Sequence, residues 1–380
     1  MRLGIVGIGN MGGVHARSIL DGRVTGCELS AVCDTIVPSP GEFGDARVFG
    51  DFREMISSEV VDAVLVATPH YSHVEIGAAA LRAGLHVLVE KPLAVHKADC
   101  ERLLAAHRGS DRVFAAMFNQ RTDPCYRKVR ELVQGGELGQ VRRVNWIITD
   151  WFRSEAYYAS GGWRASWAGE GGGVLLNQCP HNLDLYQWIF GMPDRVRGFC
   201  ALGRYHDIEV EDDVTAYFEY ADGKTAVFVT STGEAPGTNR LEVVGERGRL
   251  VVEGWRLNYL RNEIPTTEFS RTTEELFGRP AVWDVTIPLP PDRGSQHVGI
   301  LNNFVAAIRE GEPLIAPACE GIHSVELANA ILESSLSGKT VEMPLNGAAY
   351  ERRLKKLIAG SRPRKKVIPR KPSDFAKSFR

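Results

Sequence analysis

Three glycines near the amino terminus have the spacing of a phosphate-binding loop. Residues 7–12, with the sequence Gly-Ile-Gly-Asn-Met-Gly, follow a strand-type run and precede a helical pattern. Glycine at the first, third and sixth positions permits a tight turn and lets a pyrophosphate approach backbone amides at the positive end of a helix. The alternative is a glycine-rich turn without a ligand, but the order strand, loop, helix favours dinucleotide binding.

An acidic residue follows where the second predicted strand ends. Asp34 lies 22 residues after Gly12, where a carboxylate accepts hydrogen bonds from the hydroxyls of an adenosine ribose. A carboxylate at this position repels a 2′-phosphate, and the next three residues, Thr-Ile-Val, supply no cation. The sequence therefore predicts NAD as the cofactor, in preference to NADP.

Two charged residues, Glu90 and Lys91, stand at the carboxyl end of another predicted strand and precede Pro92. Open α/β sheets bind their ligands at this edge. Proline favours an extended backbone at Lys91 and so directs its ammonium group. A solvated surface pair is the alternative, and it is the commoner one for adjacent Glu and Lys.

A third candidate follows the glycine triplet of residues 171–173. A helix beginning at Asn177 places Asn177 and His181 on one face near its first turn. Pro180 is tolerated in a first turn, and Gly191 predicts the end of this helix. Asn177 as a helix cap and His181 as a hydrogen-bonded structural residue form an equally good alternative.

The elements that must position these residues alternate between strands and helices over the first 120 residues. Strand-type runs with helical patterns between them predict a doubly wound parallel sheet; the runs are 3–6, 28–33, 62–67, 85–89 and 113–118, and the helices 11–20, 72–83 and 97–107. Alternating runs later in the chain predict a second α/β domain on a large, open, mainly antiparallel sheet. The expected divisions are residues 1–121, 122–350 and a basic tail, 351–380.

Composition limits the classes of protein. The 380 residues are 44% hydrophobic and 24% charged, as in globular proteins. No apolar run is long enough for a membrane helix or a signal-peptide core. Seven scattered cysteines without metal-ligand spacing predict reduced thiols in a cytoplasmic protein and no metal site. The tail has a net charge of +10, but without interleaved aromatic residues a nucleic-acid partner is not expected.

Taken together, these motifs resemble the Gfo/Idh/MocA oxidoreductase family. The resemblance rests on the amino-terminal glycines, Glu90-Lys91-Pro92, the segment Phe-Asn-Gln-Arg at 118–121 and the glycine-triplet helix with its histidine, and it extends to about residue 345. It implies a Rossmann domain, a second domain whose open sheet commonly makes homodimer or homotetramer contacts, and oxidation of a secondary alcohol on a sugar, glycoside or cyclitol by a pyridine nucleotide.

The resemblance also assigns residues by position. It implies that Gly7, Gly9, Asn10 and Met11 face the pyrophosphate and that Asp34 faces the ribose. By the same resemblance Thr68, Pro69 and His73 line the cofactor trough, Glu90, Lys91 and Asn119 lie near the nicotinamide ribose, and Trp163 and Arg164 reach the cofactor from the second domain. The chain departs from the family at Asn177, where aspartate is frequent, and at His70, where asparagine is common.

Oxidation of an alcohol needs a base for the hydroxyl proton and a cation for the developing alkoxide. His181, with an ordinary pKa near ~6.5, is better matched to the base role than Lys91 at ~10.4. We therefore expect His181 to accept the proton, Lys91 to polarise the oxygen and Asn177 to orient the substrate. Residues 150–152, Asp-Trp-Phe, with Tyr157 and Tyr158 are candidates for a substrate wall.

Two competing functions remain open at this stage. One is a glycosidase that retains NAD and uses transient oxidation for elimination, with Tyr157 or Tyr158 as second base. The other is a non-catalytic nucleotide or sugar sensor on the same fold. Retention of both Lys91 and His181 disfavours the sensor.

Overall fold

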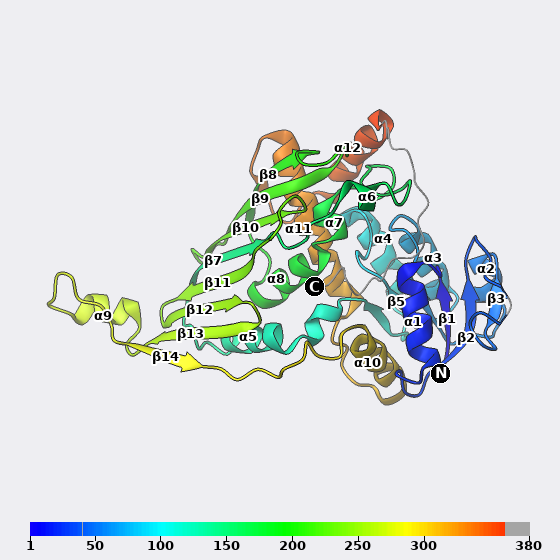
Figure 1. The fold of residues 1–380 in the computed structure, drawn as a ribbon, viewed down its shortest axis with the longest axis horizontal. Helices are drawn as coiled ribbons and strands as arrows, with labels where there is room; N and C mark the ends of the chain where they lie inside the picture. The colour runs from blue at the N-terminus through cyan, green and yellow to red at the C-terminus, as the bar shows by residue number, and fades with distance from the viewer. Residues whose placement is uncertain (40, 362–380) are drawn as a thin grey trace.

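The computed structural model describes residues 1–39 and 41–361, which form two sheets with helices packed around them (Figure 1). The first sheet is wholly parallel, in the order β3-β2-β1-β4-β5-β6. Its strands are β1 (Arg2–Val6), β2 (Glu28–Cys33), β3 (Arg47–Phe49), β4 (Ala63–Val66), β5 (His86–Val89) and β6 (Phe114–Ala116). The order reverses at β1, and the expected doubly wound sheet is confirmed.

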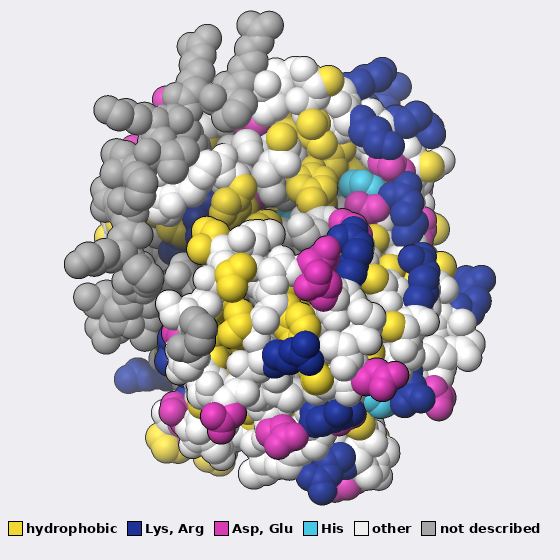
Figure 2. Space-filling model, turned by 90° about the vertical axis from the view of Figure 1, so that its right-hand side faces the viewer, with side chains coloured by type: hydrophobic (Ala, Val, Ile, Leu, Met, Phe, Trp, Pro, Cys, Tyr) yellow, Lys and Arg dark blue, Asp and Glu magenta, His cyan; other side chains and the backbone are white. Residues whose placement is uncertain are grey.

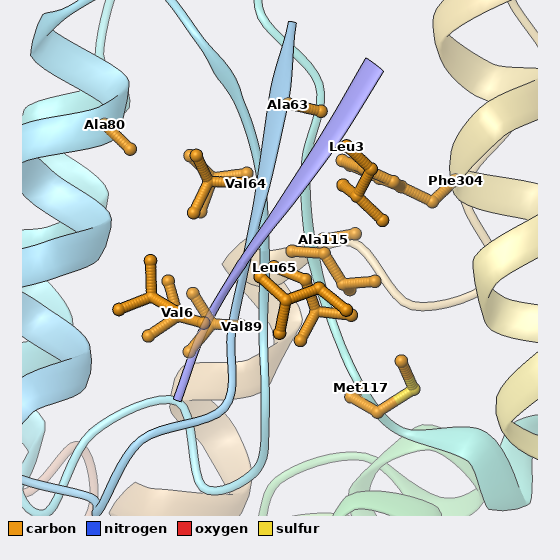
Figure 3. Close-up of a cluster of buried hydrophobic side chains, with 14 of the residues drawn as sticks. Leu3, Val6, Ala63, Val64, Leu65, Ala80, Val89, Ala115, Met117 and Phe304 are labelled. Carbon is orange, nitrogen blue, oxygen red and sulfur yellow. The ribbon is translucent and has the colours of Figure 1, made fainter. Parts of the chain in front are cut away.

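Helices cover both faces of the parallel sheet. They are α1 (Asn10–Leu20), α2 (Phe52–Ser57), α3 (Ser72–Arg82) and α4 (Lys97–His107). Because the central strands are buried on both faces, they consist almost entirely of β-branched and aliphatic residues. Figure 3 shows Ala80 of α3 approaching the sheet from one side and Phe304 of α10 (Gln296–Glu310) from the other.

The second sheet has nine strands in the order β14-β13-β12-β11-β7-β10-β9-β8-β15. Within this sheet of described residues, β7 and β10 are the one pair of strands that run parallel. The strands are β7 (Val141–Ile148), β8 (Arg195–Leu202), β9 (Glu211–Glu219), β10 (Thr225–Ser231), β11 (Asn239–Gly245), β12 (Gly248–Glu253), β13 (Arg256–Asn262), β14 (Val282–Thr286) and β15 (Val341–Glu342). Along β9 the residues Val214, Ala216 and Phe218 are buried, whereas Thr215 and Tyr217 are exposed. This alternation is typical of a sheet with one covered face, as expected.

The covered face of this sheet holds the second hydrophobic core. Its helical elements are α5 (Pro124–Gln134), α6 (Glu155–Tyr158), α7 (Val174–Asn177), α8 (Pro180–Phe190), α11 (Ala318–Ser337) and α12 (Gly347–Gly360), and the short helix η1 (Asn119–Thr122) precedes α5. Helix α9 (Thr266–Thr272) and β14 extend away from the body at one end of the molecule (Figure 1). No helix in the described part of the chain is long and apolar enough to span a membrane.

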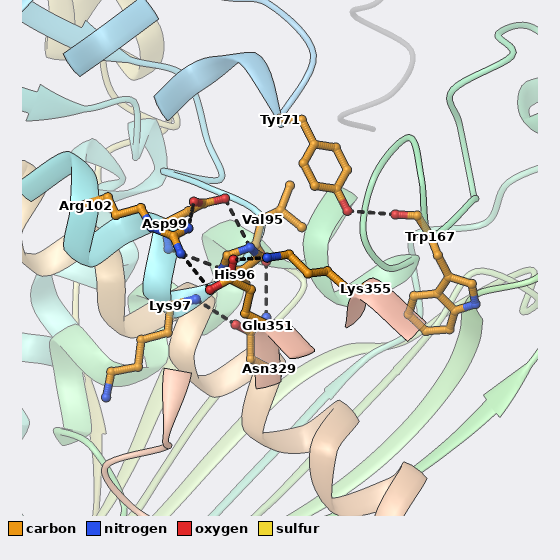
Figure 4. A network of polar contacts seen from close by, with 10 residues as sticks. All are labelled: Tyr71, Val95, His96, Lys97, Asp99, Arg102, Trp167, Asn329, Glu351 and Lys355. Carbon is orange, nitrogen blue, oxygen red and sulfur yellow. Dashed lines mark hydrogen bonds and ion pairs between the residues drawn. The ribbon is translucent and has the colours of Figure 1, made fainter. Parts of the chain in front are cut away.

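Two helices lie across the expected divisions of the chain. Helix α10 belongs by sequence to the second domain, but its residues Leu301 and Phe304 pack into the core of the parallel sheet. Helix α12 (Gly347–Gly360) runs through residue 351, where the basic tail was expected to begin. Its Glu351 pairs with Arg102 of α4 at 2.6 Å, as Figure 4 shows. The rest of that tail, residues 362–380, lies outside the described residues.

The surface at the α2 and β3 end of the molecule carries charges of both signs (Figure 2). Lys and Arg side chains lie among Asp and Glu there, so the described residues of this face form no broad field of one sign. All seven cysteines are free.

Candidate active site

The glycine loop between β1 and α1 is packed too closely for side chains at two positions and open at a third. A Cβ at Gly12 would lie 1.8 Å from the Gly7 carbonyl oxygen, and one at Gly7, where φ is +91°, would lie 2.7 Å from the Ala67 backbone. A Cβ at Gly9 would meet no atom within 4 Å. Gly9 is the cap of α1 and no side chain caps this end, so the loop leaves space in front of free helix amides, as a pyrophosphate requires.

Asp34 lies beside this loop. Its carboxylate accepts hydrogen bonds from the backbone amides of Ile8, at 2.7 Å, and Ile36, at 3.0 Å. These bonds join the loop after β1 to the loop after β2. The partly exposed carboxylate is thereby held at the switch point of the sheet, where dinucleotides bind.

His73 and Thr68 lie under the loop that follows β4. The buried His73 ring has Nε2 2.8 Å from the Thr68 carbonyl and Nδ1 2.9 Å from the Pro92 carbonyl. Its polar atoms therefore hold the loops after β4 and β5 together. The Thr68 hydroxyl is buried and has no hydrogen-bond partner in the described structure, whereas Pro69 is exposed.

Glu90 faces helix α1. Its Oε1 lies 2.7 Å from His15 Nε2, and its Oε2 accepts the Lys91 amide at 3.1 Å. Burial raises the pKa of the Glu90 carboxyl, but the hydrogen bond to His15 and the charges of His15, His297 and Lys91 together lower it to about 2. Glu90 is thus a buried carboxylate next to the base of the Lys91 side chain.

The Lys91 ammonium reaches from the edge of the parallel sheet to helix α7. Its Nζ donates to the Asn177 carbonyl oxygen at 3.0 Å. Burial lowers the pKa of Lys91, while the carboxylates of Glu90 and Glu170 act in the opposite direction. This contact brings a cation from the first half of the chain to the segment that carries His181.

Asn177 and His181 do not share one helix, which corrects the sequence prediction. Asn177 is the last residue of α7, and His181 is the second residue of α8. The break has a local cause, because Pro180 has no amide hydrogen for the Leu176 carbonyl and instead starts the new helix. Gly191 ends α8 as expected, with φ +79°.

The His181 ring is 3% exposed, and its buried Nδ1 has no hydrogen-bond partner among the described residues. The ring meets Phe118 edge to face at 6.2 Å between centroids. Burial, and then the charge of Lys91, lower the pKa of His181 well below its ordinary value. The imidazole is therefore neutral at pH 7, and the charge of Lys91 opposes its protonation.

A polar network surrounds the Asn177 side chain. Its Nδ2 donates to Glu170 Oε1, and its Oδ1 accepts the Tyr157 hydroxyl at 3.3 Å. Arg164 donates to that Tyr157 oxygen at 2.7 Å and covers the Tyr157 ring. Tyr158, by contrast, points to the sheet and bonds Thr232 at 2.9 Å.

The loop that supplies Trp163, Arg164 and Glu170 is tied to the first domain. Figure 4 shows the Tyr71 hydroxyl, next to α3, donating to the Trp167 carbonyl at 2.8 Å. Trp163 meets the buried His70 ring edge to face at 5.8 Å. These contacts hold the loop against the parallel-sheet domain, and the contact of Trp163 and Arg164 with a cofactor stays a prediction.

Asn119, on η1, donates through Nδ2 to Gln296 at 2.7 Å, and its buried Oδ1 has no partner in the described structure. Together with the Thr68 hydroxyl and the open space at Gly9, this unpartnered oxygen fits a bound dinucleotide that completes the hydrogen bonding.

Phe152 of the expected substrate wall is exposed, and Trp151 donates to Asn182 at 3.2 Å.

Sequence reasoning missed three residues of the centre. Glu170 is buried beside Asn177, and His15 and His297 lie against Glu90. A signal for Glu170 was present, because it is the only charged residue between Arg164 and Asp184. His15 and His297 have no comparable signal, since the fold alone brings them to Glu90.

Comparisons with known proteins agree with this geometry. Residues 1–118 match the family model described as "Oxidoreductase family, NAD-binding Rossmann fold", and residues 126–251 match the "GFO/IDH/MocA C-terminal domain". Inositol 2-dehydrogenase 2 of Saccharopolyspora erythraea is 27% identical over 92% of this chain and 98% of the relative. Myo-inositol 2-dehydrogenase of Thermotoga maritima is 26% identical over 67% and 76%.

Among solved structures, the WlbA dehydrogenase of Bordetella pertussis, in complex with NADH and UDP-GlcNAcA, superposes with a TM-score of 0.76. It is 24% identical, with 91% of this chain and 99% of that chain covered, so this likeness bears on the fold. The glycine loop and the position of Lys91 at the edge of the parallel sheet agree with these comparisons. The matches to both domain models show that the chain belongs to the Gfo/Idh/MocA family and is an NAD-dependent dehydrogenase.

Proposed function

We propose that the protein oxidises a secondary alcohol of a sugar, glycoside or cyclitol to a ketone, or catalyses the reverse reduction. One observation carries the proposal: the Lys91 ammonium donates a hydrogen bond to the carbonyl oxygen of Asn177, four residues before the buried His181. A cation and an unprotonated imidazole at one site are the pair that alcohol oxidation requires.

The roles follow from the chemistry of the two groups. His181 accepts the hydroxyl proton, because burial keeps its ring unprotonated at neutral pH. Lys91 donates a hydrogen bond to the same oxygen and stabilises its developing negative charge. As the O–H and C–H bonds break, the C=O double bond forms. In the reverse direction, a protonated His181 returns the proton to the carbonyl oxygen.

The cofactor side is assigned to residues of the first domain. Bound NAD+ supplies the hydride acceptor. Gly7, Gly9, Asn10 and Met11 hold the pyrophosphate, and Asp34 binds the adenosine ribose and selects against a 2′-phosphate. The remaining contacts come from Thr68, Pro69, Glu90, Lys91, Asn119, Trp163 and Arg164, with His73 positioning the Thr68 and Pro92 backbones.

The substrate side is assigned to Tyr157, Asn177 and His181. Tyr157 lies under the Arg164 guanidinium and its hydroxyl donates to Asn177, so an aromatic ring and a hydroxyl, the kinds of group that suit a polyhydroxylated ring, adjoin Asn177. The names of the inositol dehydrogenase relatives support the same substrate class.

NADH absorbance at neutral pH, measured with cyclitols, free sugars and glycosides, tests the proposal. We expect at least one of these alcohols to give NADH, and product mapping then identifies the carbon oxidised. Release of an aglycone without net NADH would indicate the NAD-retaining glycosidase instead. Tight NAD binding without turnover of any alcohol or ketone would indicate a sensor and would overturn the proposal.

We also propose that the outer face of the nine-stranded sheet joins copies of the chain into a homodimer or homotetramer. Exposed apolar side chains on three strands of this sheet, Phe199 of β8, Tyr217 of β9 and Ile147 of β7, support this assignment. Sedimentation equilibrium tests it, and a monomer at micromolar concentration would contradict it.

The seven free cysteines support the expected cytoplasmic location.

A further inference from the structure

Glu170 is a buried carboxylate that the roles above do not use. It is 1% exposed, and its two oxygens face different groups. Oε1 accepts the Asn177 side-chain amide, and Oε2 accepts the Ala165 backbone amide at 2.5 Å. The Arg164 guanidinium lies 3.9 Å from Oε1. Both ends of the carboxylate are thus fixed next to the carbonyl that binds Lys91.

The charges around Lys91 explain why a carboxylate is needed there. The carboxylates of Glu90 and Glu170 favour the charged form of Lys91, and the guanidinium groups of Arg153 and Arg164 oppose it. The pKa values of the buried His70, His73 and His181 and of the partly buried His297 are lowered, and the charge of Lys91 is one cause for each of them. Because Glu90 is already paired with His15, Glu170 is the acidic group on the α7 side of Lys91.

A buried ammonium is retained only when a negative charge compensates its lost hydration. We propose that Glu170 is a positioning residue of the reaction centre: it fixes the Asn177 side chain and supplies the charge that keeps Lys91 protonated. The effect of Glu170 on kinetics rests on the proposed function, in which Lys91 polarises the substrate oxygen. The effect of Glu170 on the protonation of Lys91 is independent of that function. Glu170 acts through its neighbours and is assigned no contact with substrate.

The direct test measures Lys91 itself. Acetic anhydride labels unprotonated amines, so the pH dependence of Lys91 labelling, followed by peptide mass spectrometry of the full chain, reports its protonation. Glu170→Gln keeps the shape and an acceptor oxygen but removes the charge. We expect the labelling midpoint to fall by about one pH unit. Glu209→Gln is the matched control, because Glu209 bonds the same loop through the Trp167 amide and does not contact Lys91; its midpoint should equal that of the parent protein.

Moving the carboxylate separates charge from shape. The double variant Glu170→Gln/Asn177→Asp places the negative charge one hydrogen bond away, on α7. We expect its Lys91 midpoint to return to that of the parent, even if the single variant folds poorly. An unchanged midpoint in folded Glu170→Gln, or a double variant that folds with a low midpoint, would overturn the proposal.

The kinetic arm distinguishes the two proposals. In Glu170→Gln the high-pH decline of kcat/KM should begin about one pH unit earlier, and the double variant should restore it. If no alcohol is oxidised by the parent protein, the dehydrogenase proposal fails but labelling still decides the role of Glu170. If the parent oxidises an alcohol and labelling is unchanged in Glu170→Gln, only the role of Glu170 fails.

Discussion

The glycine loop and the Lys91 centre are built by different kinds of constraint. In the loop, Gly7 and Gly12 are five residues apart and a Cβ on Gly12 would meet the Gly7 carbonyl oxygen, so backbone sterics within one short segment define the geometry. At the centre, Lys91, Glu170, Asn177 and His181 come from separate elements and meet through side chains. The first arrangement is visible in sequence spacing, and the second depends on how the domains pack.

The largest effect on stability is expected where the domains join. Arg121 on η1 forms a two-bond pair with Asp184 of α8, at 2.7 and 2.6 Å, with both side chains 1% exposed. Arg121→Ala leaves the Asp184 charge buried and should lower the free energy of unfolding by about 3–5 kcal/mol, measured in urea. Replacing both partners, as Arg121→Met/Asp184→Leu, should cost much less. A loss below 1 kcal/mol in the single variant would show that packing alone positions α8.

Two glycine variants test whether the loop is governed by sterics or by its ligand. Gly12→Ala forces the backbone apart and should destabilise the protein by about 1–3 kcal/mol and weaken NAD binding at least ~10-fold. Gly9→Ala should leave the melting temperature unchanged but still weaken NAD binding, because its methyl group enters the open space before α1. Calorimetric titration with NAD and thermal unfolding measure the two quantities. Equal NAD affinity in Gly9→Ala and the parent would place the pyrophosphate elsewhere.

Asp34→Ala should weaken NAD binding by about 10- to 100-fold, since charge-assisted hydrogen bonds contribute about 1.5–3 kcal/mol. Binding of NADP should weaken less, because the repulsion of its 2′-phosphate is also removed. The ratio of the two dissociation constants is the measurement. An unchanged ratio would mean that Asp34 acts only on the Ile8 and Ile36 amides.

The smallest expected effect concerns pH. His70 and His181 have pKa values well below the ordinary value of 6.5, burial being the first cause for both. The unfolded chain therefore binds more protons than the folded one below about pH 6.5, so stability declines as the pH falls from there toward the folded-state pKa values. The melting temperature should be lower at pH 5.5 than at pH 7.5, and His70→Asn should reduce this difference. If the melting temperatures of His70→Asn and the parent differed by the same amount at both pH values, the assignment of a lowered pKa to His70 would be wrong.

The sequence predicted the parts of the fold that depend on local patterns. Strand β2 and helix α4 were predicted with the residues they have in the structure. The short β3 and α2 were not predicted, because three and six residues give too little periodicity. Helix α12 was mistaken for the start of a tail because its basic residues dominate the pattern, although Tyr350 and Leu354 are buried.

At the site, the residue types were predictable but their arrangement was not. Lys91 and His181 were proposed from their chemistry together with the family resemblance, yet the break before Pro180 was overlooked, so Asn177 and His181 were placed on one helix. Glu170 stands out in the sequence as a lone charge, but it was missed because its contacts with Asn177 and Ala165 form only in the tertiary structure. Charge compensation across domains has no sequence period.

The central claim is that the Lys91 ammonium and the His181 imidazole act on one alcohol. Turnover and NAD affinity, measured side by side for Lys91→Ala and His181→Ala with an alcohol that the parent oxidises, test it most directly. The account predicts that kcat falls about 10²- to 10⁴-fold in each variant while the dissociation constant of NAD changes only slightly. Parent-like turnover in either variant would contradict it.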